Sequence, residues 1–189
     1  MKPILLLDVD GVILLQRASG PSIMRTAHGF IDRDVAERLY ELDGLFEIVW
    51  CTGWEHYANE VIGPMFGMGK LPVVSLSNHF KGDWTPRPHY DPEDIGTDRD
   101  ATMNALSNWK LPGVKHWLGD SDHPVAWLDD EIGQTDVKRW AQKRGKTKLV
   151  RTHASRGLTE SEMRVLVDFA REHRPAFKQD GGLRGRLQG

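Results

Sequence analysis

The chain has 189 residues, of which 39% are hydrophobic and 28% are charged. This composition is typical of one ordinary globular domain and excludes a disordered or fibrous protein. The apolar start of the chain contains Asp8 and Asp10, which a signal peptide would not tolerate, and no other stretch reaches membrane-spanning length. The single cysteine, Cys51, excludes an internal disulfide and lies in an apolar run, so we expect a buried thiol in a cytoplasmic protein.

The formal net charge of −2 conceals an uneven distribution of charge along the chain. Residues 138–189 contain 14 Lys and Arg against 5 Asp and Glu, whereas residues 1–137 contain 11 against 22. A basic segment can contact phosphate groups or nucleic acid, but the solvated faces of terminal helices have the same composition. The sequence leaves both interpretations open.

Two kinds of hydrophobic pattern alternate along the chain. Short apolar runs bounded by polar residues or glycine favour buried strands, and apolar residues three or four positions apart favour helices. The last helical pattern begins with a capping pair, Thr159 and Glu162. In chain order the patterns predict a strand at 3–7, a helix at 33–43, a strand at 46–51, a helix at 55–66, a strand at 71–76, helices at 101–109 and 113–118, strands at 124–128 and 147–152, and a helix at 157–173.

Two segments have no clear periodicity. Residues 77–100 are rich in Pro, Gly and Asp, and a stretch of this length inside a compact domain is usually functional or mobile, so it is a candidate for a minimal lid. Residues 176–189 are expected to form a disordered tail, which leaves one domain over residues 1–175. Strands that alternate with helices predict a three-layer, Rossmann-like α/β fold with a mostly parallel central sheet.

Polar side chains stand where three of the predicted strands end. Asp8 and Asp10 follow the first strand, Thr52 follows the second, and Asp129 and Asp130 follow the strand at 124–128. Because sites in parallel sheets form beyond the carboxyl ends of the strands, these groups are expected to meet. Neighbouring carboxylates repel one another unless a cation or a proton lies between them, and Mg²⁺ favours such oxygen ligands.

Each of these features also has a structural explanation when it is taken alone. An Asp-x-Asp-Gly sequence fits an acidic turn, paired aspartates fit the first turn of a helix, and Thr52 fits an ordinary β-branched strand residue. The combination is more specific than any single part. In their order and spacing, the three features resemble the motifs of the haloacid dehalogenase-like (HAD) superfamily over about residues 1–170. A further likeness is to the HAD domains of RNA-repair proteins.

The resemblance implies a phosphohydrolase with Mg²⁺ as cofactor. It also implies a lysine that binds the phosphoryl group, for which the chain offers two candidates. A lysine before a helix is the remaining HAD motif, and Lys110 fits it better than Lys115 because Pro112 marks the first helical turn. Asp8 would attack phosphorus to form an aspartyl-phosphate, and Asp10 would act as the general acid and base, a residue that in this superfamily accompanies phosphatases and mutases.

The resemblance also implies where the metal and the phosphoryl group would bind. Mg²⁺ would be held by Asp8, by the carbonyl group of Asp10 and by Asp129, with Asp130 as a ligand through water or as an orienting group. The substrate would meet Thr52 and Lys110 at its transferring oxygens, together with Gly53 and Trp54 in the adjacent turn.

The size of the substrate and the choice between catalysis and binding stay open. Neither place where HAD enzymes carry a cap has room for a full one, so we expect an accessible site that accepts a small phosphoester or a nucleic-acid end. Trp54 and Trp84 are candidates for stacking a base, although packing beneath a long loop explains them equally well. A phospho-receiver domain would carry its adjacent acids on the first strand, unlike this chain. A HAD-like protein that only binds phosphate or nucleic acid is the alternative function.

Overall fold

The centre of the protein is a sheet of four parallel strands. The computed structural model describes residues 1–79 and 108–173. The strands are ordered β4-β1-β5-β6, and each pairs with its neighbour in parallel. All four were predicted, with no end shifted by more than one residue: β1 (Ile4–Leu7), β4 (Glu47–Trp50), β5 (Val125–Asp129) and β6 (Thr147–Arg151).

One face of the sheet is covered by α1 (Val35–Leu45) and α6 (Glu160–His173). Successive side chains of a strand point to opposite faces, and Leu5 and Leu7 of β1 point into the core beneath these two helices. The predicted capping pair of α6 is confirmed, because the carboxylate of Glu162 accepts hydrogen bonds from the backbone amide and the hydroxyl group of Thr159.

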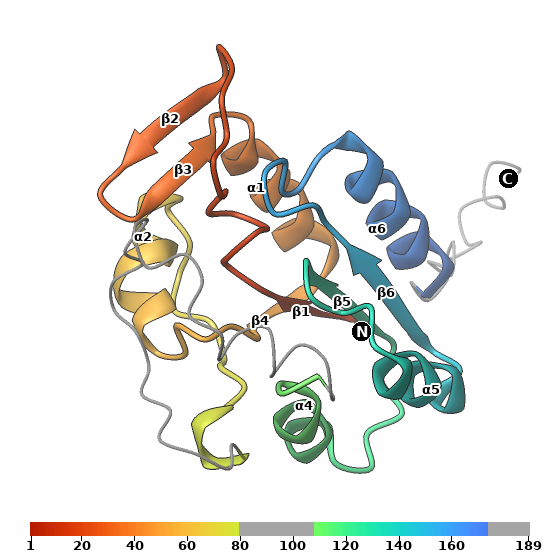
Figure 1. The fold of residues 1–189 in the computed structure, drawn as a ribbon. Helices are drawn as coiled ribbons and strands as arrows, with labels where there is room; N and C mark the ends of the chain where they lie inside the picture. Colours follow the sequence, from red (N-terminus) through yellow and green to blue (C-terminus); the bar gives the residue numbers. More distant parts are fainter. Residues whose placement is uncertain (80–107, 174–189) are drawn as a thin grey trace, which may run out of the picture.

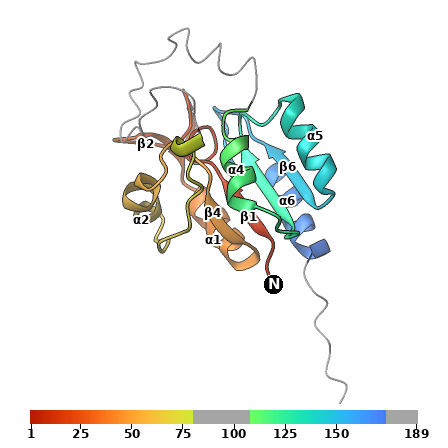
Figure 2. The same cartoon turned by 90° about the horizontal axis from the view of Figure 1, so that it is seen from below.

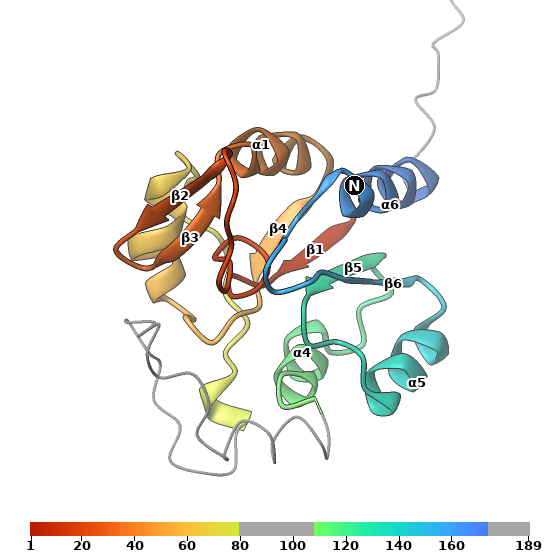
Figure 3. The same ribbon diagram turned by 45° about the horizontal axis from the view of Figure 1, so that its top comes forward.

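The opposite face is covered by α4 (Leu111–Leu118) and α5 (Thr135–Arg144). Ile4 and Leu6 of β1 point into this second core. Figures 1 and 3 show the sheet between the two pairs of helices, which confirms the three-layer α/β fold. The central strand β1 is buried on both faces, as expected for a parallel sheet covered by helices.

A hairpin between β1 and α1 was not predicted. Its strands are β2 (Ile23–Thr26) and β3 (Gly29–Asp32), and they pair antiparallel around Ala27 and His28. Two-residue hairpin turns are usually signalled by Asn-Gly or Asp-Gly, and this turn has neither. The hairpin stands at the end of the sheet opposite the N terminus (Figure 2).

The helix predicted at 55–66 is divided into two short pieces. The first is a π-helix, η1 (Ala58–Ile62), and the second is α2 (Gly63–Met65). Pro64 lacks an amide hydrogen and its ring would clash with the carbonyl group four residues earlier, so a regular α-helix cannot pass through it. The wider turn is visible in the amide of Gly63, which donates to the carbonyl oxygen of Ala58, five residues back.

The strand predicted at 71–76 is wrong. Only Val73 forms a bridge with Trp50 of β4, because Pro72 has no amide hydrogen to donate to a ladder. The segment nevertheless runs beside β4, where Trp50 donates to the carbonyl oxygen of Pro72 and accepts from the amide of Val74. Its apolar residues were therefore correctly predicted as core, although not as a regular strand.

One helix was missed and several predictions lie outside the described residues. The helix α5 has only two buried residues, Val137 and Ala141, so its polar sequence hid the helical pattern. The described part also contains a short 3-10 helix, η2 (Ser77–His79). Outside it lie residues 80–107, with most of the predicted lid and of the 101–109 helix, and the predicted tail at 176–189. No helix in the described ranges is long and apolar enough to span a membrane.

Candidate active site

The predicted site residues lie together because β1 is paired with β4 on one side and with β5 on the other. Leu7, the last residue of β1, is in register with Trp50 and Leu128. The residues that follow these three strands therefore emerge at one edge of the sheet. The backbone amide of Asp8 donates to the carbonyl oxygen of Leu128 at 3.1 Å, and the amide of Cys51 donates to that of Leu7 at 2.9 Å.

Lys110 lies between two buried carboxylates. Its Nζ is 2.6 Å from Oδ2 of Asp8 and 2.8 Å from Oδ2 of Asp129. Burial alone would lower the pKa of Lys110, but Asp129 and Asp8 outweigh burial and raise it well above its usual value. The ammonium group is therefore charged. Of the two lysines left open by the sequence, the structure brings Lys110 to the acidic cluster, whereas Lys115 is exposed on α4.

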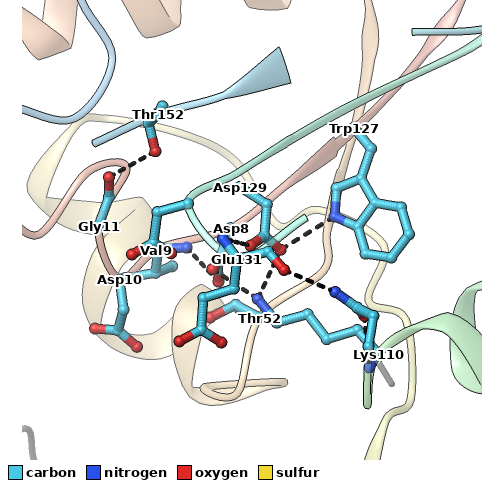
Figure 4. A network of polar contacts seen from close by, with 12 residues as sticks. Asp8, Val9, Asp10, Gly11, Thr52, Lys110, Trp127, Asp129, Glu131 and Thr152 are labelled. Atoms are coloured by element: carbon cyan, nitrogen blue, oxygen red, sulfur yellow. Dashed lines mark hydrogen bonds and ion pairs between the residues drawn. The ribbon is translucent and has the colours of Figure 1, made fainter. Parts of the chain in front are cut away.

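Asp129 is completely buried and is held by donors on both carboxylate oxygens (Figure 4). Its Oδ2 accepts from Lys110 and from the indole Nε1 of Trp127, which is 3.1 Å away. Its Oδ1 accepts from the backbone amide of Glu131 at 2.8 Å. These contacts fix the direction of the carboxylate and leave little freedom for it to turn.

Asp8, Asp129 and Asp130 together form a group that fits a divalent metal ion. One carboxylate oxygen from each residue lies within 4.8 Å of the other two. Burial raises the pKa of Asp8, and Asp129 and Asp10 raise it further against the opposing effect of Lys110. Burial, followed by Asp129 and Glu131, raises the pKa of Asp130 to about 7. The site thus has more negative charge than Lys110 balances, and its oxygen donors are those that Mg²⁺ prefers.

The turn after β1 approaches this group through Gly11. Gly11 has a φ of +68°, which favours glycine. A Cβ atom at this position would overlap the carboxyl group of Asp130, so only glycine allows the turn to pack here. Behind the turn, the hydroxyl group of Thr152 donates to the carbonyl oxygen of Gly11 at 2.8 Å.

Asp10 differs from the other three aspartates because its carboxylate lies outside the trio of side chains that could hold a metal ion, and the group predicted to bind the metal here is its backbone carbonyl. It is partly buried, and its Oδ2 accepts a hydrogen bond from the indole Nε1 of Trp54 at 3.0 Å. Burial raises its pKa to about 6, although the hydrogen bond from Trp54 and the charge of Lys110 lower it. A carboxyl group with this pKa can both give and take a proton near neutral pH.

Thr52 and Gly53 form the turn after β4, beside Asp8. Thr52 is completely buried, and its Oγ1 accepts a hydrogen bond from the backbone amide of Trp54 at 3.3 Å. Gly53 is partly buried in the same turn. Both residues occupy the edge of the sheet where the sequence placed them.

The suggestion that Trp54 stacks a base is wrong for this conformation. Only 3% of Trp54 is exposed, and its ring belongs to the core under α1 and α6. Packing, the other interpretation offered by the sequence, describes it correctly. The second candidate, Trp84, lies outside the described residues.

Sequence patterns did not reveal the hydrogen bonds that orient the acidic side chains. Trp127, Trp54 and Thr152 were not predicted to hold site residues, and nothing in their local sequence indicates it. Trp127 stands inside an apolar run and reads as core. A weak signal exists for Thr152, since it is a hydroxyl residue directly after β6 at the same edge of the sheet.

The fold and the order of these residues define a class. The fold is a parallel α/β sheet whose first strand leads to Asp8 and Asp10. Beside these residues lie Thr52, Lys110 and the Asp129–Asp130 pair. This fold and this set of residues are those of the HAD-like hydrolase superfamily. Residues 4–163 match the model of the HAD domain in Swiss Army Knife RNA repair proteins. This match covers most of the chain, and the chain belongs to that family. In the same comparisons no curated protein and no solved structure matches it.

Proposed function

We propose that this protein is a Mg²⁺-dependent phosphatase that hydrolyses a phosphomonoester through an aspartyl-phosphate. The observation that carries the proposal is the environment of Asp8. One oxygen of this buried carboxylate is 2.6 Å from the ammonium group of Lys110, and the residue also belongs to the trio of possible metal ligands. A buried carboxylate held by a fixed cation beside a candidate metal site is suited to attack phosphorus.

In the proposed first half of the reaction, an oxygen of Asp8 attacks phosphorus and the bond from phosphorus to the leaving oxygen breaks. Asp10, in its protonated form, gives its proton to that oxygen, so the alcohol leaves neutral. In the second half, a water molecule attacks the aspartyl-phosphate and gives a proton to Asp10. The P–O bond to Asp8 breaks, phosphate is released, and both aspartates return to their starting states.

Asp8, Asp129 and Asp130 would hold the metal ion together with the carbonyl group of Asp10. When bound, Mg²⁺ supplies positive charge that neutralises the phosphoryl oxygens and the excess of carboxylates. Lys110 adds a fixed cation, and the hydroxyl group of Thr52 and the backbone at Gly53 would bind the transferring oxygens. Positioning and charge of this kind supply most of the catalysis in phosphoryl transfer.

Two observations support a nucleic-acid end as the substrate over a small phosphoester. The first is that the chain belongs to a family of HAD domains found in RNA-repair proteins. The second is the position of basic residues at the edge of the site. Arg151, the last residue of β6, is exposed and donates to the carbonyl oxygen of Asp130. The loops after β1 and β6 are joined by a hydrogen bond from the amide of Gln16 to the carbonyl oxygen of Ala154, and they carry the exposed Arg17 and Arg156. Exposed arginines suit a phosphate backbone. A cytoplasmic location is part of this proposal.

The test is multiple-turnover phosphate release by the full chain. The substrates are small phosphomonoesters and oligonucleotides phosphorylated at either the 5′ or the 3′ end, with Mg²⁺ or with a chelator. We expect release that needs Mg²⁺, is lost in Asp8→Asn and is fastest with one oligonucleotide. Release that persists in Asp8→Asn would contradict the mechanism. Tight binding of oligonucleotides without turnover would favour the alternative, a HAD-like protein that only binds phosphate or nucleic acid.

A further inference from the structure

Trp54 contacts both turns that carry the proposed chemistry. Its indole Nε1 donates to Oδ2 of Asp10 at 3.0 Å, on the turn after β1. Its backbone amide donates to Oγ1 of Thr52 at 3.3 Å, on the turn after β4. Asp10 and Thr52 are far apart in the sequence, so Trp54 connects two groups that the chain itself does not hold together.

Trp54 is itself held in place by packing and by its neighbour. The ring is buried in the core and forms a T-shaped pair with the ring of His28, from the hairpin turn, with 5.8 Å between the ring centroids. Glu55 has a φ of +44°, a strained value for a residue with a side chain. Its carboxylate accepts hydrogen bonds from the amides of Leu76 and Ser77 at 2.6 and 2.7 Å. These contacts maintain the strained turn and with it the position of the indole.

The direction of the hydrogen bond decides which oxygen of Asp10 is available. An indole N–H can only donate, so the Oδ2 that it contacts acts as an acceptor. The other oxygen, Oδ1, is left to carry the proton that is exchanged with the substrate. A general acid is effective only when its proton lies within hydrogen-bonding distance of the leaving oxygen, so the orientation of the carboxyl group matters as much as its presence.

We propose that Trp54 is a positioning residue. It orients the carboxyl group of Asp10 towards the leaving oxygen and holds that group at a fixed position relative to Thr52. The inference rests on the proposed phosphatase function and adds to it a residue outside the four motifs matched in this chain. It predicts that loss of the indole N–H harms the step in which the alcohol departs. The harm depends on how much that alcohol needs a proton.

The test compares two substrates and two matched variants of the full chain. Trp54→Phe keeps an aromatic ring but removes the donor to Asp10. Trp50→Phe makes the same change at an equally buried tryptophan, whose Nε1 donates to Asn59 at 3.0 Å, away from the acidic cluster. Each protein is assayed with p-nitrophenyl phosphate, which has a good leaving group, and with the best alkyl phosphomonoester of the panel. The quantity compared is kcat/KM, which reports the steps up to departure of the alcohol.

For Trp54→Phe we expect kcat/KM on the alkyl ester to fall by roughly tenfold or more, because a well-placed general acid contributes roughly 10²- to 10⁴-fold. The fall on the aryl ester should be clearly smaller. Trp50→Phe should change both values by the same factor, if it changes them at all. Equal losses on the two esters in Trp54→Phe would overturn the positioning role and leave the proposed function intact. Absence of turnover by the wild type on every substrate would overturn both.

A second measurement tests the contact without relying on catalysis. In a ¹⁵N-labelled protein the Trp54 indole N–H signal is the one that Trp54→Phe lacks. We expect Asp10→Ala, which removes the acceptor, to shift that signal, whereas the indole signal that Trp50→Phe lacks should stay in place. An unchanged Trp54 signal in Asp10→Ala would show that the hydrogen bond is absent in solution and would overturn the inference.

Discussion

Asp129 and Asp10 lie at the same edge of the sheet but are held in very different ways. Asp129 is completely buried, and donors from Lys110, Trp127 and the amide of Glu131 contact its two oxygens. Asp10 is partly exposed and is oriented through Oδ2 by Trp54. The contrast suits two tasks, because a metal ligand benefits from a fixed direction whereas an acid and base needs one oxygen within reach of the substrate.

Of the changes considered, removal of Lys110 should have the largest effect, because it disrupts the contacts that hold Asp129. Lys110→Met leaves Asp8 and Asp129 buried without their shared cation. We expect the metal-free protein to lose about 3–5 kcal/mol of unfolding free energy, as for other broken buried ion pairs. The rate should fall by about 10³-fold. Urea unfolding and phosphate release measure the two effects.

Lys115→Met is the matched control for this change. Because Lys115 is exposed on α4, the helix that directly follows Lys110, its loss should alter stability by less than about 0.5 kcal/mol. Mg²⁺ should restore part of the stability of Lys110→Met, since it supplies the missing positive charge. A stability of Lys110→Met equal to that of the wild type would contradict the buried network.

A methyl group at Gly11 should disturb both the turn that carries Asp10 and the group of metal ligands. In Gly11→Ala the new Cβ would overlap the carboxyl group of Asp130, and the φ of +68° would be strained. We expect a loss of about 1–3 kcal/mol in stability. We also expect Mg²⁺ affinity to fall by roughly 10- to 100-fold, as when groups beside a metal ligand are changed. Calorimetric titration with Mg²⁺ checks this. Gly44→Ala, on α1 with open space around it, serves as the control.

The dependence of stability on pH should distinguish metal-free from metal-bound protein. The pKa of Asp10 is raised to about 6 and that of Asp130 to about 7, from 3.8. The folded state therefore binds more protons than the unfolded state between these values. The stability from these groups is present below about pH 4 and is lost as the pH rises through 6 and 7.

This loss should amount to at most about 1.4 kcal/mol for each carboxyl group and pH unit. Mg²⁺ should flatten the decline, because a cation favours the ionised carboxylates. Urea unfolding between pH 4.5 and 7.5, with Mg²⁺ or chelator, measures both curves. In Asp130→Asn the decline near pH 7 should become smaller, because Asp130 no longer contributes to it. Two curves of the same slope would count against metal binding by this cluster.

The smallest effect should come from Trp127. Trp127→Phe removes one of the donors to Asp129 but leaves Lys110 and the amide of Glu131 in place. We expect Mg²⁺ affinity to fall by about 10-fold, the lower end of the range for groups behind a metal ligand. Unlike Trp54→Phe, this change should slow the alkyl and aryl esters equally. A preference for the aryl ester in Trp127→Phe would contradict the separate roles of the two tryptophans.

The fold was predictable wherever buried residues form a hydrophobic pattern within a short stretch of the sequence. The runs that became the two central strands, β1 and β5, are buried throughout because helices cover both sides of the sheet. Prediction failed where a single residue or few buried positions decided the outcome. Pro72 prevents a regular strand, Pro64 divides a helix, and α5 buries too little to show its period.

The sequence by itself determined which strands end in acidic or hydroxyl residues and in what order, because those features are local and follow directly from neighbouring residues. Only the tertiary structure decided that Lys110 and not Lys115 enters the cluster. It also decided that Trp54 is buried and donates a hydrogen bond to Asp10, instead of being exposed to stack a base. The reason is physical. Both contacts join residues on different elements, so their existence depends on the pairing of strands and the packing of helices, which no short stretch of sequence encodes.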